Sequence, residues 1–132
     1  MSKLLGNLAG CHGALSALLS SQGPKPHTRG VILFDHEEVG SQSARGAGSF
    51  FVRSLLSRVL EAHGPFSESR LARAIARSYL VSSDMAHGVH PNYPDRHEPG
   101  HSPLLGQGPV IKSNSNQAYG TDGETWALFE RL

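Results

Sequence analysis

The feature that most constrains the fold of this chain is a short apolar run that ends in a cluster of acids. Residues 30–34 read Gly-Val-Ile-Leu-Phe, and Asp35-His36-Glu37-Glu38 follow directly, before a turn. An apolar run bounded by turn residues is typical of a buried strand. Open α/β sheets place functional groups at the carboxyl ends of their strands. We therefore expect the acids at a sheet edge, either as a solvated turn or as a site for metal binding and proton transfer.

In the rest of the chain, short apolar runs alternate with segments whose apolar residues recur at helical spacing. Residues 79–82 and 108–112 are expected to form two further strands. Apolar residues at helical spacing follow Asn7, a candidate N-cap, and recur over 49–63, which closes with Gly-Pro. Thr121-Asp122-Gly123-Glu124 has the form of a capping box for a last helix. This order of elements predicts an α/β sandwich.

Smaller features in the middle of the chain each have a structural interpretation. Ser67 is expected to cap a short helix, on which arginines at three- and four-residue spacing form a solvated face (Arg70, Arg73 and Arg77). Residues 85–108 form a long loop rich in Pro, Gly and His, and loops of this length are usually functional or disordered. Gly46 and Gly48 precede a helix and are expected to let that helix pack close to the acidic turn, and His36 is expected to solvate the turn.

Composition excludes several classes of function. The 132 residues fit one domain, and a formal charge of +1 gives no basic footprint for nucleic acid. The sequence contains no run of eighteen apolar residues that would predict a membrane span, and no signal peptide is evident. A single cysteine, Cys11, fits a reducing compartment. We expect a cytoplasmic protein that binds neither nucleic acid nor membrane.

Three motifs then carry a resemblance to a known family. They are Asp35-His36-Glu37-Glu38-Val39-Gly40-Ser41, the segment 82–93 (SSDMAHGVHPNY) and the segment 108–112 (GPVIK). In this order they resemble signatures of the aspartyl aminopeptidases, dinuclear zinc metallopeptidases that remove acidic residues from peptide N-termini. The resemblance implies a helix-flanked mixed β-sheet sandwich of the zinc aminopeptidase type. It further implies that residues 1–132 are a single partial catalytic domain, from the later-middle part of the family's metallopeptidase domain.

The resemblance also implies roles for individual residues. Glu37 resembles the general base that takes a proton from a metal-bridging water, while Glu38 and Asp84 resemble ligands of one metal each. His87, Lys112 and Tyr119 stand where the family binds substrate, and the Lys112 cation suits an acidic side chain or a peptide carboxylate. The cofactor implied is zinc, two ions in the family, with Mn or Co able to substitute. The reaction implied is attack of a metal-activated hydroxide on the scissile carbonyl.

One departure from the family pattern leaves two interpretations open. Gly6 stands where the resemblance implies an aspartate that bridges both metals, and two further His ligands of the family lie outside this chain. The chain is either a metalloaminopeptidase whose missing ligands come from another copy or another chain, or a non-catalytic α/β remnant that oligomerises. Partners implied are a peptide with an acidic N-terminus and further copies of the chain, because unpaired strand edges and apolar faces favour self-association.

Overall fold

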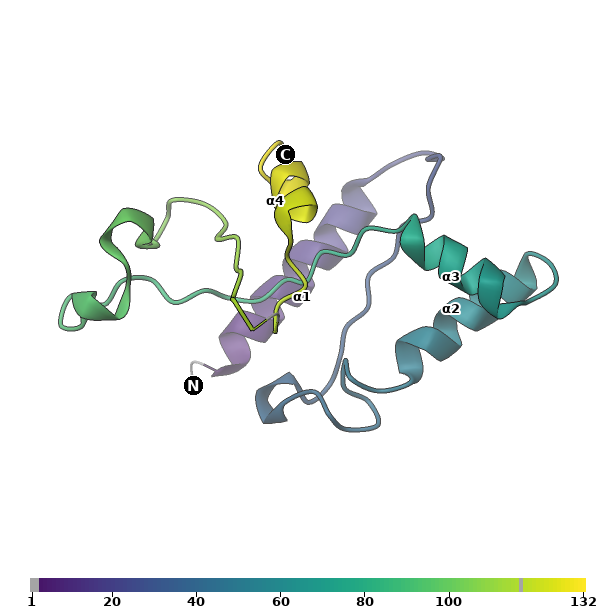
Figure 1. The fold of residues 1–132 in the computed structure, drawn as a ribbon, viewed down its shortest axis with the longest axis horizontal. Helices are drawn as coiled ribbons and strands as arrows, with labels where there is room; N and C mark the ends of the chain where they lie inside the picture. The colour runs from purple at the N-terminus through teal and green to yellow at the C-terminus, as the bar shows by residue number, and fades with distance from the viewer. Residues whose placement is uncertain (1–2, 117) are drawn as a thin grey trace. The chain divides into compact units, whose positions relative to one another are not determined.

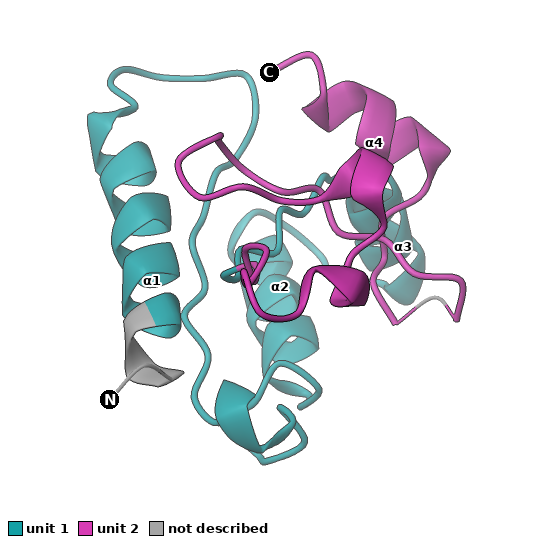
Figure 2. Cartoon of the chain, turned by 90° about the vertical axis from the view of Figure 1, so that its left-hand side faces the viewer, with its two compact units in different colours: residues 1–85 teal, residues 86–132 magenta. Residues whose placement is uncertain are grey.

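Helices make up all the regular secondary structure of the computed structural model, which describes residues 3–116 and 118–132. The chain divides into two units, residues 1–85 and residues 86–132, coloured teal and magenta in Figure 2. Each unit is considered by itself. Within the described residues, no helix is both long enough and apolar enough to cross a membrane.

The first helix, α1 (Lys3–Ser20), begins before Asn7, so the predicted N-cap at Asn7 is wrong. Two of its glycines, Gly6 and Gly10, lie close to the segment that ends the first unit. A Cβ atom on Gly6 would lie 2.9 Å from Cγ of Met85, and one on Gly10 would lie 3.4 Å from Oγ of Ser83. The N-terminal half of α1 therefore contacts residues 83–85 through positions that have no side chain.

Helices α2 (Phe51–Ala62) and α3 (Glu68–Ala76) lie side by side and form the packed part of the first unit (Figure 1). Leu71 on α3 is 2% exposed, which makes it the one buried apolar side chain among the described residues. The predicted cap of α3 is confirmed, since Oγ of Ser67 accepts a hydrogen bond from the backbone N–H of Arg70 at 3.1 Å. This cap satisfies one of the free N–H groups at the helix start.

Arg70 corrects the prediction of a solvated arginine face. Its guanidinium donates hydrogen bonds to the carbonyl oxygens of Leu60 (3.1 Å), His63 (3.0 Å) and Pro65 (2.9 Å). These carbonyls belong to the last turn of α2 and the residues after it, where helical partners run out. Arg53 of α2 and Glu68 of α3 form an ion pair between the same two helices. Arg70 therefore caps one helix from the next.

The second unit has little regular structure. Two 3-10 turns, η2 (Pro94–Arg96) and η3 (Pro99–His101), interrupt the long loop, and the N–H of Val89 donates to the carbonyl of Pro103 at 2.9 Å. The predicted last helix is present as α4 (Gly123–Phe129). Its capping box uses Asp122 and Thr125, one residue later than the sequence pattern placed it.

The predicted sheet is absent from the described residues, so the α/β sandwich is wrong for this structure. Residues 30–34, 79–82 and 108–112 are non-helical, and no strand ladder joins them to each other. Leu33 is 53% exposed and Leu80 is 85% exposed. A strand needs a partner for its N–H and C=O groups, whereas a helix satisfies them within itself. These apolar runs have no partner strand in the described chain.

Candidate functional site

The acidic cluster forms a turn rather than the end of a strand. The 3-10 turn η1 (Glu37–Val39) carries both predicted carboxylates, and Gly40 closes it in the left-handed region with φ 94°. The N–H of Gly40 donates to the carbonyl of Glu37 at 2.9 Å. Glu37 and Glu38 are exposed, and neither carboxylate takes part in a hydrogen bond or ion pair within the described structure. Both are accessible to an incoming ion or water.

The residues around η1 tie it to the loop that follows. His36 lies in the left-handed region (φ 63°), and its Nδ1 is 2.6 Å from Oγ of Ser43. The carbonyl of His36 accepts a hydrogen bond from the N–H of Ser41 at 3.0 Å. Sequence patterns assigned His36 only to solvation and gave Ser43 no role. The sequence signal for this contact was the position of His36, a polar residue directly before the paired acids.

Asp84, the other predicted metal ligand, belongs to the same unit. One of its carboxylate oxygens accepts a hydrogen bond from the N–H of Met85 at 2.7 Å, and the residue is exposed. Met85 is also the residue that the Cβ of a substituted Gly6 would meet. Gly6, where the resemblance implies a bridging aspartate, therefore lies next to Met85, the residue that follows Asp84.

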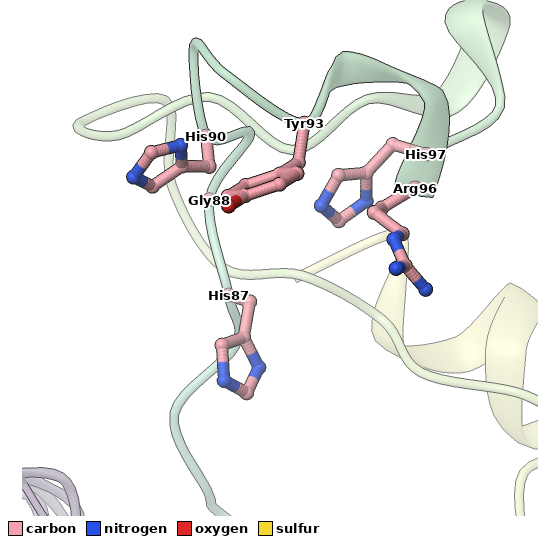
Figure 3. A pocket seen from close by; sticks show the side chains of 6 residues that line it. All are labelled: His87, Gly88, His90, Tyr93, Arg96 and His97. Atoms are coloured by element: carbon pink, nitrogen blue, oxygen red, sulfur yellow. The ribbon is translucent and has the colours of Figure 1, made fainter.

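The second unit holds an open cavity of about 460 Å³ around the predicted substrate residue His87 (Figure 3). His90, Tyr93, Arg96 and His97 also line it, and the rings of His90 and Tyr93 are 5.2 Å apart between centroids. The lining contains three imidazoles and a guanidinium but no acidic residue. Such a surface suits an anionic group.

Sequence reasoning missed part of this cavity. Arg96 and His97 fall within the predicted loop 85–108 without a role of their own, and Tyr93 is named only as part of the motif 82–93. The available signal was the density of histidine between residues 87 and 101 beside an aromatic residue and an arginine. The loop brings them together because the bond from Val89 to Pro103 closes its ends.

Lys112 and Tyr119, the other predicted substrate residues, flank an asparagine-rich turn in the second unit. Oδ1 of Asn114 accepts hydrogen bonds from the N–H groups of Ala118 (2.9 Å) and Tyr119 (3.3 Å). Tyr119 is exposed, whereas Lys112 is half-buried. Asn114 thus fixes the backbone from which the Tyr119 side chain projects.

The described residues do not by themselves fit a catalytic zinc ion. Such an ion normally takes three protein ligands and one water. Across residues 3–116 and 118–132, no three His, Cys, Asp or Glu side chains gather in a group that could hold a metal. Glu38 and Asp84 supply two carboxylates at most. A complete metal centre needs ligands in addition to these.

Comparison with known proteins places this geometry in context. Residues 1–132 match the family described as aminopeptidase I zinc metalloprotease (M18). A protein named "Probable M18 family aminopeptidase 2" from Pseudomonas paraeruginosa is 50% identical over 128 residues, which are 97% of this chain and 28% of the relative. Its namesake from Ectopseudomonas mendocina is 48% identical over 131 residues, 99% of this chain and 29% of the relative. The chain thus spans less than a third of the curated relatives it matches.

A solved structure is also similar. One chain in the cryo-EM structure of the Ape4 and Nbr1 complex aligns with a TM-score of 0.66 and 45% sequence identity. The alignment covers 74% of this chain and 18% of that chain.

Proposed function

This chain belongs to the M18 family of zinc metalloproteases, and from that membership we propose that it forms part of the active centre of an aminopeptidase. Glu37 acts as the general base, and Glu38 and Asp84 each bind a zinc ion of a two-ion centre. The substrate is a peptide whose N-terminal residue is Asp or Glu. Residues 1–132 belong to a single catalytic domain, of which they are a later-middle part.

The observation that carries this proposal is the family match over residues 1–132, which includes the paired acids on an exposed, hydrogen-bonded turn. A general base must reach the proton that it abstracts, and the Glu37 carboxylate is accessible and unpaired within the described chain. Residues 3–116 and 118–132 supply no complete set of zinc ligands, so the centre needs ligands in addition to Glu38 and Asp84.

Acidic specificity is proposed from the cationic groups of the second unit. His87 contributes to a cavity whose lining carries no acidic residue, and Lys112 offers an ammonium group to a carboxylate. A charged hydrogen bond contributes about 1.5–3 kcal/mol. Lys112→Met is therefore expected to lower kcat/KM for an N-terminal Asp peptide by about 10- to 100-fold, and to change it little for an N-terminal Ala peptide.

The experiment that tests the function uses a relative to supply the missing ligands. Residues 1–132 would replace the matching segment of the Pseudomonas paraeruginosa protein, with Gly6 either kept or changed to Asp. A Cβ atom at Gly6 would lie 2.9 Å from Cγ and 3.3 Å from Cβ of Met85, so Gly6→Asp requires the Met85 side chain to shift. We expect the Gly6→Asp protein to hydrolyse an N-terminal Asp peptide in the presence of zinc. Glu37→Gln should then lower kcat by about 100- to 10,000-fold.

Glu61→Gln on α2 is the matched control, an exposed acid outside the proposed centre, and it should leave the rate unchanged. An exchanged segment that remains active after Glu37→Gln would overturn the proposed base. Hydrolysis by the isolated chain, abolished by Glu37→Gln, would show that copies of the chain complete the centre among themselves.

The second candidate function is a non-catalytic, oligomerising remnant, and Gly6 is the observation that favours it. If the exchanged segment with native Gly6 is inactive and Gly6→Asp restores turnover, the native chain is a remnant whose loss of activity lies at one ligand. Comparable turnover from both proteins would instead exclude this second candidate.

A further inference from the structure

His36 directly precedes the paired acids and holds an unusual backbone conformation. Its φ of 63° and ψ of 29° lie in the left-handed region, which non-glycine residues rarely occupy. Such conformations persist where surrounding contacts over-determine them, and they cluster at functional sites. His36 is also the N-cap residue of η1, yet its side chain makes no capping bond to the turn. Its side chain is engaged elsewhere.

The imidazole of His36 pairs with Ser43, seven residues along the chain. The separation of 2.6 Å between Nδ1 and Oγ is that of a short hydrogen bond, with donor and acceptor set by the imidazole tautomer. The N–H of Ser41 donates to the carbonyl of His36 at 3.0 Å. One side-chain bond and one backbone bond thus close the loop that contains Glu37 and Glu38.

Ser41 links this loop to the glycines that follow. It too has a positive φ, 61°, and its carbonyl accepts a hydrogen bond from the N–H of Gly48 at 3.0 Å. Gly46 is buried, and a Cβ atom there would lie 2.1 Å from the carbonyl oxygen of Ser41. The backbone of Ser41 packs against Gly46. The predicted packing of the following helix against the acidic turn stays a prediction. The loop is therefore held on both sides of the acids.

The carboxylates of Glu37 and Glu38 have no partners of their own in the described structure, so the backbone alone sets where they point. We propose that His36 and Ser43 are positioning residues, whose mutual hydrogen bond holds the turn that presents Glu37 and Glu38. This proposal rests on the proposed function: a fixed direction of the two carboxylates matters only if they bind metal and take a proton from water.

The test uses the full chain without metal or substrate, so an inactive protein does not affect it. Ser43→Ala removes the hydroxyl, and Ser43→Thr retains it. We expect Ser43→Ala to move the ¹⁵N resonance of His36 Nδ1 and to speed amide exchange at Ser41 by about five- to tenfold, the effect of losing one ordinary hydrogen bond. The backbone amide signals of Glu37 and Glu38 should shift with it. Ser43→Thr should restore all three.

Substitutions of the histidine give an independent arm. His36→Ala should shift the backbone amide signals of Glu37 and Glu38 and speed amide exchange at Ser41. His36→Asn should retain these backbone signals in part, since Asn tolerates the left-handed region and can hydrogen-bond. His27→Ala, at an exposed histidine for which no side-chain partner is seen in the described residues, is the matched control. Unchanged Glu37, Glu38 and Ser41 signals in Ser43→Ala would overturn the proposal. That result would leave the segment-exchange assay of Glu37 unaffected, so the two failures are distinguishable.

Discussion

The helix pair α2–α3 and the extended segments 30–34 and 79–82 all carry apolar residues but reach different states. In the helix pair, Leu71 is buried and Arg70 satisfies carbonyls at the end of α2. In the extended segments, Leu33 and Leu80 stay exposed and the backbone has no ladder within the described chain. An apolar segment therefore forms regular structure only where its backbone hydrogen bonds can be made by residues nearby in the chain.

The largest effect is expected from removing the buried side chain of the helix pair, Leu71. Leu71→Ala should lower the free energy of unfolding by about 2–5 kcal/mol, because a cavity adds to the lost transfer energy. Chemical denaturation followed by far-ultraviolet circular dichroism measures the change. Leu80→Ala, at a residue 85% exposed, is the control and should cost within about 0.5 kcal/mol. Equal losses in both variants would contradict the difference between the two regions.

The second prediction concerns the cap that one helix gives the other. Arg70→Gln removes the guanidinium that donates to Leu60, His63 and Pro65, and should cost about 1.5–3 kcal/mol. Amide exchange at the C-terminal end of α2 should accelerate before that of its middle. Arg77→Gln, just beyond the end of α3, should change neither. Unchanged exchange at the end of α2 in Arg70→Gln would show that the cap contributes nothing.

The third prediction tests the extended segments directly. Unpaired apolar strands favour association, so we expect the chain to self-associate at tens of micromolar in sedimentation velocity. Leu33→Lys should shift it toward monomer while changing the free energy of unfolding by no more than about 0.5 kcal/mol. A sharp monomer peak from the unsubstituted chain would contradict the expectation.

The smallest effect is expected at the cap of α4. Hydrogen bonds from the backbone and side chain of Thr125 hold the pKa of the Asp122 carboxyl below its ordinary value of 3.8. Because the folded pKa is the lower one, this stabilisation is complete above the ordinary value and is lost as pH falls through the folded pKa. Helicity of α4, followed by the amide shifts of Trp126 and Leu128, should decline in that window. Asp122→Asn should remove the dependence on pH, and a persistent decline in that variant would assign it to another group.

Local patterns in the sequence predicted the helices well. The apolar stripe and the closing Gly-Pro located α2, and Ser67 located the start of α3. The segment Thr121-Asp122-Gly123-Glu124 located α4, although its capping box lies one residue later. The three motifs gave a resemblance that the family match over residues 1–132 confirms. The roles of Glu37, Glu38, Asp84, His87, Lys112 and Tyr119 stay predictions.

The errors have one physical origin. The predicted strands failed because their hydrogen bonds must come from other strands, and sequence pattern does not say whether those strands are present. Arg70 was predicted to be solvated because the spacing of the arginines gives information only about α3. Its hydrogen-bond partners lie at the end of α2 and just after it. The bond from His36 to Ser43 was missed because it joins two residues across a turn of unpredicted shape.

Local sequence was enough to locate α2 and α3 and to identify the family resemblance, because caps, periodicity and motifs are local. The tertiary structure alone decided which apolar residues are buried, which arginine caps a neighbouring helix and how the acidic turn is held. Those outcomes depend on contacts between different elements of the chain, such as Arg70 with the end of α2 and His36 with Ser43. Their free energy depends on geometry that only folding supplies.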